Sequence, residues 1–369
     1  MKKVLLVAPI GKDNAVNGGY NKVANNLNYV FNLFKEKHDY EFDSVHPTEL
    51  FTVEKEYDVV LFQCHSSTLI NNPKFLSVFK EKRKLFKECY LHIAWETSPF
   101  PSLWTFLDSM FDGYIANSEF CVFEMKKISK KPVYCFPFYI EDSFLEHKLS
   151  IEDKKDEKEF TVLFMGQNTK RKGIEDAINA FCVFAQGKND VKMIVKYHNL
   201  SNKEIPVEQL IESSVSLNSY LNVPEIYTID YELNEEQIVN TYKNSSVLLF
   251  PSKGEGFGLP ILESNLVGIP AIYTDWSSMQ EVGGYCRSIN IPLKYDISYA
   301  IGMSTYKYEF TSVWANPKFQ EIIIALELLY IHWKKDKVSY YEKCLNGTKH
   351  LQKLLNCKKN EFLEEVIAK

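Results

Sequence analysis

The sequence lacks any hydrophobic run of the roughly 18 to 20 residues that cross a membrane. The first apolar run, Val4 to Ile10, is short and continues into polar residues without a small-residue cleavage site. We interpret it as a buried strand and not as a signal peptide. An excess of basic residues is also missing, since 43 Lys and Arg stand against 48 Asp and Glu, a net charge of −5. This balance argues against a general attraction to nucleic acid.

Cys-x-x-Cys pairs are missing too. The eight cysteines are scattered through apolar segments, so the sequence indicates neither a zinc site nor a redox motif. Scattered buried thiols are typical of a reducing compartment, and we therefore expect the protein in the cytoplasm.

The length of 369 residues suits two domains of roughly 150 to 200 residues each. Hydrophobic residues make up 45% of the chain, and the mean hydropathy is −0.24, as in globular proteins. Continuous apolar runs alternate with stretches of helical periodicity, which predicts α/β domains with parallel sheets covered on both faces. The expected strands are 3–9, 57–65, 87–96, 111–120 and 131–138, then 160–166, 191–199, 246–252 and 269–275.

A dense charge run, 146–159, interrupts this alternation. We interpret it as a solvated connector between domains, with a charged surface hairpin as the alternative. The predicted domains are residues 1–150 and 151–356, and a terminal helix at about 357–369 joins the first. Two doubly wound domains in tandem predict a cleft between them, where strand carboxyl ends face each other.

One stretch combines a glycine loop with two carboxylates. "GEGFGLPILESNLVGIPAI", 254–272, follows the predicted strand 246–252. Pro260 suits the first turn of a helix, and Gly268 suits its end. A strand, a glycine loop and a helix N-terminus together form a cradle of backbone N–H groups for an anion. Glu255 and Glu263 would repel a diphosphate, so we expect them to accept hydrogen bonds from hydroxyls on either side of it. A nucleoside diphosphate sugar has this distribution of groups.

A second glycine loop supplies positive charge. The segment "FTVLFMGQNTKRKGIEDAINAF" carries Lys170, Arg171 and Lys172 between a strand and a helix. These side chains are candidates to neutralise the diphosphate, and a solvated turn is the structural alternative. An Asp-x-Asp pair, the usual device where a divalent cation does this work, is not found, and Asp230-Tyr231-Glu232 comes nearest. We predict no metal site and no cofactor besides the substrate.

These segments resemble the group-one (family four) retaining glycosyltransferases. "EGFGLPILE" with "SNLVGIPAIYTD" resembles their E-x7-E signature, "GQNTKRKGIEDAINAF" their phosphate loop and "GGYNKVANNL" their N-terminal glycine loop. "WETSPFPSLW" and "YIANSEF" are similar to segments of a subset. The resemblance implies the GT-B fold: two Rossmann-like, doubly wound domains with an interdomain cleft.

The resemblance also implies roles for individual residues. Glu263 matches the glutamate that binds the ribose, and Glu255 the one that contacts the transferred sugar at its anomeric centre. Lys172 matches the phosphate lysine. The other donor-binding positions that it implies are Gly18, Gly19, Gly166, Arg171, Phe257, Gly258 and Leu259. Gln167 stands where many members have arginine, a charge that Arg171 could replace.

The catalytic position of the first domain stays open. Many members have a histidine at a strand end facing the sugar, and Glu96 occupies that position here. His65, at the end of 57–65, is the other candidate, and neither residue is the third alternative. We interpret His92, inside the strand 87–96, as a core histidine. Ser118 is expected to cap the helix that follows it.

The sequence thus predicts a metal-independent, retaining enzyme of the hexosyltransferase type in glycan or glycolipid assembly. Its donor would be UDP- or GDP-linked, and its acceptor a glycan, a lipid-linked molecule or a protein. A non-catalytic subunit that binds a sugar nucleotide and stabilises a partner transferase is the alternative, and a phosphorylase is a third. The basic run Lys126 to Lys131 is either a solvated face or a peripheral contact with the inner membrane face.

Overall fold

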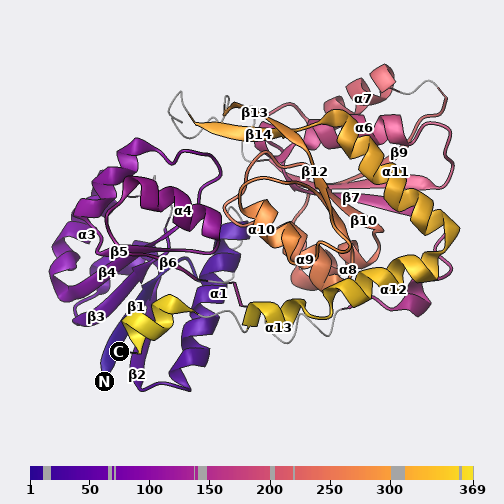
Figure 1. Ribbon diagram of the computed structural model, residues 1–369. Helices are drawn as coiled ribbons and strands as arrows, with labels where there is room; N and C mark the ends of the chain where they lie inside the picture. Colours follow the sequence, from indigo (N-terminus) through magenta and orange to yellow (C-terminus); the bar gives the residue numbers. More distant parts are fainter. Residues whose placement is uncertain are drawn as a thin grey trace. The chain divides into compact units, whose positions relative to one another are not determined.

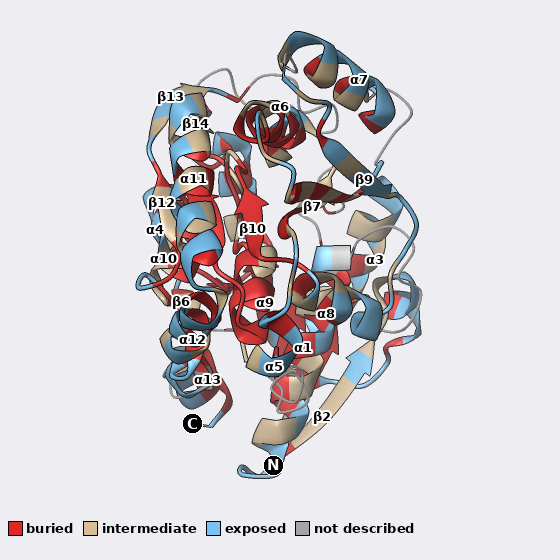
Figure 2. Ribbon diagram, turned by 90° about the vertical axis from the view of Figure 1, so that its right-hand side faces the viewer, coloured by how far each residue is buried: buried red, intermediate tan, exposed pale blue. Residues whose placement is uncertain are grey.

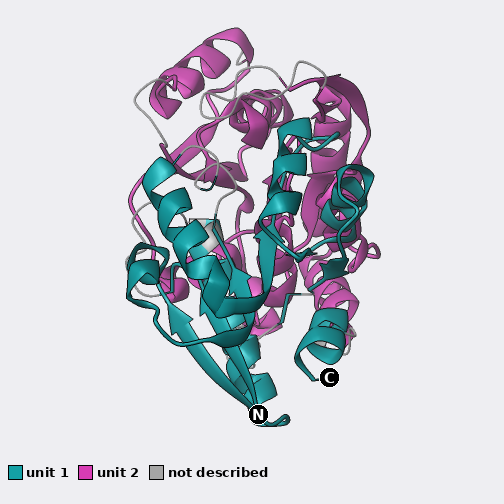
Figure 3. Cartoon of the chain, turned by 90° about the vertical axis from the view of Figure 1, so that its left-hand side faces the viewer, with its two compact units in different colours: residues 1–139, 355–369 teal, residues 140–354 magenta. Residues whose placement is uncertain are grey.

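The computed structural model describes residues 1–10, 18–64, 69, 72–136, 138–139, 148–199, 204–218, 221–300, 312–356 and 360–368 (Figure 1). The chain forms two compact units. The first comprises Met1–Tyr139 with Leu355–Lys369, and the second Ile140–Leu354 (Figure 3). Each unit is built around its own six-stranded sheet.

The sheet of the first unit is parallel, in the order β2-β1-β3-β4-β5-β6. β2 was not predicted from the sequence, because its half-exposed YEFDSV pattern is less apolar than the patterns of its neighbours. The elements are β1 Lys2–Val7, α1 Gly18–Lys35, β2 Tyr40–Val45, η1 Pro47–Thr52, β3 Tyr57–Phe62, α3 Pro73–Lys82, η2 Arg83–Leu85, β4 Phe86–Ile93, η3 Ser102–Ser109, β5 Gly113–Ala116, α4 Glu119–Ile128 and β6 Val133–Cys135.

The core of the first unit includes residues from the end of the chain. Phe362 and Leu363 are buried in one cluster with Val4 and Leu6 of β1 and Phe31 of α1. The terminal helical segment Leu363–Ile367 therefore packs on the first unit. In sequence, the second unit, Ile140–Leu354, separates this segment from the rest of the first unit. Burial of these apolar side chains provides the driving force that holds the segment there.

The sheet of the second unit is also parallel, in the order β12-β11-β10-β7-β8-β9, and its central strand β10 is buried, as Figure 2 shows. An antiparallel pair, β13 with β14, forms a separate two-stranded sheet. The elements are α5 Ile151–Lys154, β7 Phe160–Gln167, η5 Lys170–Lys172, α6 Ile174–Phe184, β8 Val191–His198, α7 Val207–Asn218, β9 Glu225–Ile229, α8 Glu235–Lys243, β10 Val247–Phe250, α9 Leu259–Val267, β11 Ala271–Thr274, α10 Ser278–Gly284, β12 Ile291–Leu293, β13 Tyr295–Tyr299, β14 Val313–Pro317, α11 Phe319–Lys335, α12 Lys337–Thr348 and α13 Leu351–Asn356.

This second strand order is that of a Rossmann-type sheet. The chain leaves β7 toward β8 and β9 on one side, and β10, β11 and β12 follow on the other side. The order therefore reverses between β7 and β10, which are hydrogen-bonded neighbours. In open α/β sheets, ligands bind at the carboxyl ends of the strands that flank such a reversal. The loops after β7 and β10 are the two glycine loops of the sequence analysis.

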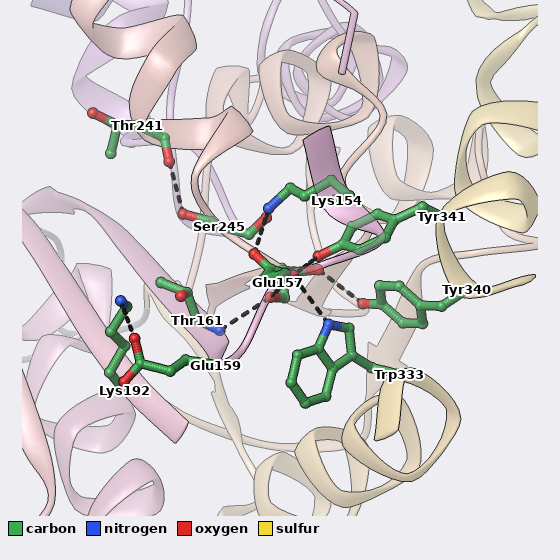
Figure 4. Close-up of polar contacts among 11 residues, drawn as sticks. Lys154, Glu157, Glu159, Thr161, Lys192, Thr241, Ser245, Trp333, Tyr340 and Tyr341 are labelled. Atoms are coloured by element: carbon green, nitrogen blue, oxygen red, sulfur yellow. Dashed lines mark hydrogen bonds and ion pairs between the residues drawn. The ribbon is translucent and has the colours of Figure 1, made fainter. Parts of the chain in front are cut away.

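The charge run 146–159 is not wholly solvated, which corrects its interpretation as a solvated connector. Lys154 is 5% exposed, and its Nζ lies 2.6 Å from Glu157 Oε1. The indole of Trp333 donates a 3.0 Å hydrogen bond to Glu157 Oε2, and the hydroxyl of Tyr341 donates to the same oxygen (Figure 4). The sequence could not show this, because the partners come from α11 and α12, far along the chain.

We expect Glu157→Ala to lower the free energy of unfolding by about 3 to 5 kcal/mol, because Lys154 would stay buried without its partner charge. Glu152→Ala is the matched control. Its pair with Lys155 is solvent-exposed, so the loss should stay below about 1 kcal/mol. Urea unfolding curves of the two variants measure the difference, and equal losses would contradict the buried role of Glu157.

Among the described residues, no helix is both long and apolar enough to span a membrane. The seven described cysteines are all free thiols, and six of them are buried.

Candidate functional site

The loop after β10 folds as the sequence predicted. Gly258 is the N-cap of α9 with φ of 98°, a left-handed conformation that L side chains rarely adopt. Pro260 lies in the first turn of α9, and Gly268, with φ of 100°, ends the helix. The loop thus delivers residues 254–258 to the positive end of a helix dipole.

The loop after β7 is tied directly to it. Lys253 N donates a 2.7 Å hydrogen bond to the carbonyl of Arg171. At Gly173, φ is 69°, and an added Cβ would lie 2.4 Å from the carbonyl oxygen of Pro251. Only glycine fits where the loops approach so closely, so the two loops form one structure.

We therefore expect Gly173→Ala to destabilise the protein by several kcal/mol, on the order of 3, because the new Cβ meets backbone in a strained conformation. Gly284→Ala is the control. No heavy atom lies within 4 Å of its added Cβ, and it ends helix α10. Thermal unfolding should show a large decrease in Tm for the first variant only, and similar Tm values would refute the tight contact.

Glu255 lies where the two loops meet. It is 7% exposed, and its Oε1 accepts hydrogen bonds from Lys172 Nζ at 2.6 Å and from Ser252 Oγ at 2.5 Å. The same oxygen forms an ion pair with the Arg171 guanidinium at 3.1 Å. Burial opposes the charged form of Glu255, but the positive charges of Lys172 and Arg171 outweigh it and lower its pKa. The carboxylate is therefore ionised and paired with both cations.

The Lys-Arg-Lys run is not a solvated turn. Lys170 is exposed, whereas Arg171 is 7% exposed and donates a 2.8 Å hydrogen bond to the carbonyl of Gly254. Lys172 Nζ also lies 5.3 Å from the centre of the Phe250 ring. Arg171 thus fixes the glycine loop through its backbone, and Lys172 places a positive charge beside Glu255.

Glu263 lies in α9 and is 6% exposed. The hydroxyl of Tyr242, from α8, donates a 2.9 Å hydrogen bond to its Oε2. Sequence reasoning missed Tyr242, which precedes β10 and has no spacing that marks it as polar or functional.

Three serines that sequence reasoning also missed hold Glu255. Besides Ser252, Ser277 Oγ accepts from the Glu255 backbone N–H at 3.0 Å, and Ser278 Oγ donates to its carbonyl at 2.6 Å. Ser277 has φ of 55° and ψ of −149°, a strained conformation of the kind found at functional sites. The repeated polar residues after β11 were the available signal.

The remaining predicted donor positions lie in β7, on the loop after β10, at the start of α9 or in the first unit. Gly166 lies in β7, where a Cβ would be in ordinary contact with Lys172, so the structure does not require glycine there. Phe257 is buried, and Leu259 begins α9. Gly18 and Gly19 begin α1.

In the first unit, His92 is buried, and its Nε2 lies 2.7 Å from Asn117 Oδ1. Since Asn117 Nδ2 donates to the carbonyl of Phe136, its Oδ1 is the acceptor, and His92 Nε2 carries the proton. Burial lowers the pKa of His92 to about 4, so the ring is neutral at physiological pH. This agrees with its interpretation as a core histidine.

Of the two catalytic candidates in the first unit, the structure describes only Glu96. β4 ends at Ile93, so Glu96 lies beyond the strand and is half-buried. His65 lies outside the described residues. Ser118 caps α4, accepting a 3.3 Å hydrogen bond from Cys121 N, as predicted.

Part of the chain is similar in sequence to known glycosyltransferases. Residues 147–283, within the second unit, match the family described as glycosyl transferases group 1. ORF330 of Acidianus filamentous virus 2 (isolate Italy/Pozzuoli), whose name assigns it provisionally to the glycosyltransferases, is 28% identical over 169 residues. The match covers 45% of this chain and 46% of that protein, so it spans about half the length of this curated relative.

Solved structures show the fold over most of the chain. Sucrose-phosphate synthase from Thermosynechococcus elongatus has a TM-score of 0.61 at 13% identity, over 96% of this chain and 95% of that chain. The pneumococcal O-GlcNAc transferase GtfA has a TM-score of 0.55 at 15% identity, over 88% of this chain and 60% of that chain.

The two parallel sheets and these likenesses define an α/β protein of the GT-B class, as the sequence predicted. The match to the group 1 glycosyl transferase family lies within the second unit, over residues 147–283.

Proposed function

We propose that the protein transfers a sugar from a nucleoside diphosphate sugar to an acceptor hydroxyl, with retention of the anomeric configuration. The observation that carries this proposal is the contact between Lys172, Arg171 and Glu255 at the reversal point of the second sheet. The cations, the loop amides and a helix N-terminus would bind the diphosphate. Carboxylates on either side of it would accept hydrogen bonds from the hydroxyls of the sugar and the ribose.

In this reaction the bond between the anomeric carbon and the diphosphate oxygen breaks, the acceptor oxygen bonds to that carbon, and the hydroxyl proton passes to the leaving diphosphate. Lys172 stabilises the negative charge that develops on the leaving diphosphate. Its Nζ also contacts Glu255, so a bound diphosphate and Glu255 share one cation. Glu255 binds the sugar at its anomeric centre, and Glu263 binds the ribose.

The finer assignments remain proposals. We propose a UDP- or GDP-linked hexose as donor, and a glycan, a lipid-linked molecule or a protein as acceptor. The GtfA structure was solved in complex with UDP and GlcNAc, which makes UDP a natural first probe. The catalytic roles of Glu96 and His65 stay predictions, and so does a cytoplasmic location.

Peripheral membrane contact through Lys126 to Lys131 has no support from the comparisons. In the structure Lys127 Nζ lies 2.6 Å from the carboxylate of Glu124 and 4.3 Å from the centre of the Phe123 ring. This lysine is therefore partly engaged within its own helix, and the membrane contact stays a prediction.

A panel of nucleotide sugars tests the proposal, with thermal shift as the readout for binding and nucleotide release as the readout for turnover. We expect at least one donor to raise Tm and to release its nucleotide. Binding without release, in the presence of varied acceptors, would favour the non-catalytic subunit. No shift with any donor at millimolar concentration would refute the proposed function.

A further inference from the structure

Glu263 and Tyr242 form a buried hydrogen-bonded pair between α8 and α9, two helices that pack against each other. Tyr242 is 0% exposed and Glu263 is 6% exposed, and the phenol oxygen lies 2.9 Å from Glu263 Oε2. A carboxylate that is this well buried must be stabilised by hydrogen-bond donors. The phenol of Tyr242 is one such donor, supplied by a different helix.

The direction of this hydrogen bond is fixed. Burial, together with the neighbouring negative charge of Glu263, raises the pKa of Tyr242 well above its ordinary value. The phenol therefore keeps its proton throughout the physiological range, and it always donates to the carboxylate.

A fixed donor restricts the orientation of the carboxylate. A free glutamate side chain has several rotatable bonds, and ordering it opposes binding by an entropy loss. A hydrogen bond from a ring that is itself fully buried selects one orientation before any ligand arrives. The carboxylate has about four acceptor sites, and a single phenol hydrogen bond occupies one of them.

We propose that Tyr242 is a positioning residue for the nucleotide ribose, which holds the Glu263 carboxylate ready to accept hydrogen bonds from the two ribose hydroxyls. The inference rests on the proposed function, in which Glu263 binds the ribose. Tyr242 lies outside the E-x7-E segment, on the preceding helix α8. It would be a further residue that determines selectivity for a ribonucleotide.

Tyr242→Phe tests this proposal, because it removes the donor and keeps the ring that fills the core. Isothermal titration calorimetry of the full chain would use UDP and GDP, each beside its 2′,3′-dideoxy analogue, which lacks the diol. We expect the variant to bind the ribonucleotide about tenfold more weakly than the wild type. The dideoxy analogue should bind the two proteins almost equally, so that the preference for ribose shrinks.

Tyr340→Phe is the matched control. Tyr340 is 1% exposed, and its hydroxyl donates a 2.8 Å hydrogen bond to the carbonyl of Ser246, in the same unit. The Tyr340→Phe substitution removes a buried phenol hydroxyl of the same kind but leaves the hydrogen bond to Glu263 in place. The preference for ribose should therefore stay at the wild-type value.

The outcomes separate the inference from the proposed function. If wild-type protein binds none of these nucleotides, the proposed function fails and the inference fails with it. If wild-type protein binds them and Tyr242→Phe weakens both members of a pair equally, or neither, only the positioning role is overturned. The preference for ribose is the ratio of the dissociation constants of the dideoxy analogue and the ribonucleotide, measured on the same protein. Partial misfolding lowers the binding-competent fraction equally for both ligands, so it does not change this ratio.

Discussion

Glu255→Gln is expected to lower turnover of the donor by at least about a hundredfold and, at the same time, to strengthen the binding of the nucleoside diphosphate about threefold. Under the proposed function, turnover falls because the carboxylate no longer acts at the sugar. Diphosphate binding improves because Lys172 and Arg171, which lie 2.6 and 3.1 Å from Glu255 Oε1, lose the anion that competes for them. Nucleotide release and calorimetry with UDP and GDP measure the two effects.

The control for this variant is Glu124→Gln. Glu124 is also buried, at 3% exposure, and forms a 2.6 Å ion pair with Lys127 in the first unit. The Glu124→Gln variant should change neither turnover nor nucleotide affinity. Comparing it with Glu255→Gln separates the specific effect of Glu255 from any general effect of losing a buried carboxylate. A parallel loss of turnover and of diphosphate binding in Glu255→Gln would contradict its assignment to the sugar.

Lys172→Ala has the second large expected effect. Under the proposed function, in which the largely buried Lys172 contacts the diphosphate, we expect UDP or GDP to bind on the order of a hundredfold more weakly, because that charge-assisted contact is lost. The uncharged nucleoside, uridine or guanosine, should bind the variant and the wild type alike. Calorimetry with each diphosphate and its nucleoside measures both effects.

Lys170→Ala provides the comparison within the same turn. Lys170 belongs to η5 with Lys172, but it is exposed. We expect nucleotide affinity to stay within about twofold of the wild type, because exposed charges are screened by water and salt. If Lys170→Ala weakened the diphosphate as much as Lys172→Ala, general electrostatic attraction would explain the binding and the specific contact would not.

The sequence by itself determined the fold class and the loops of the site. Continuous apolar strands between helices are typical of a parallel sheet with helices on both faces, and the structure contains two parallel sheets. Gly258, Pro260 and Gly268 fixed the loop and α9, because their backbone preferences act over a few residues. Weakly patterned strands such as β2 and β9 escaped prediction, since they gain their order from pairing with stronger neighbours.

Only the tertiary structure decided which partners the charged residues have. Arg171 and Lys172 lie 83 or more residues from Glu255 in sequence, and the pairing of β7 with β10 brings them into contact. Glu157 likewise finds Trp333 and Tyr341 only after α11 and α12 have packed. Local sequence encodes backbone conformation through short-range sterics, whereas the choice of an ionic partner depends on which strands become neighbours and on how far burial removes the charges from water.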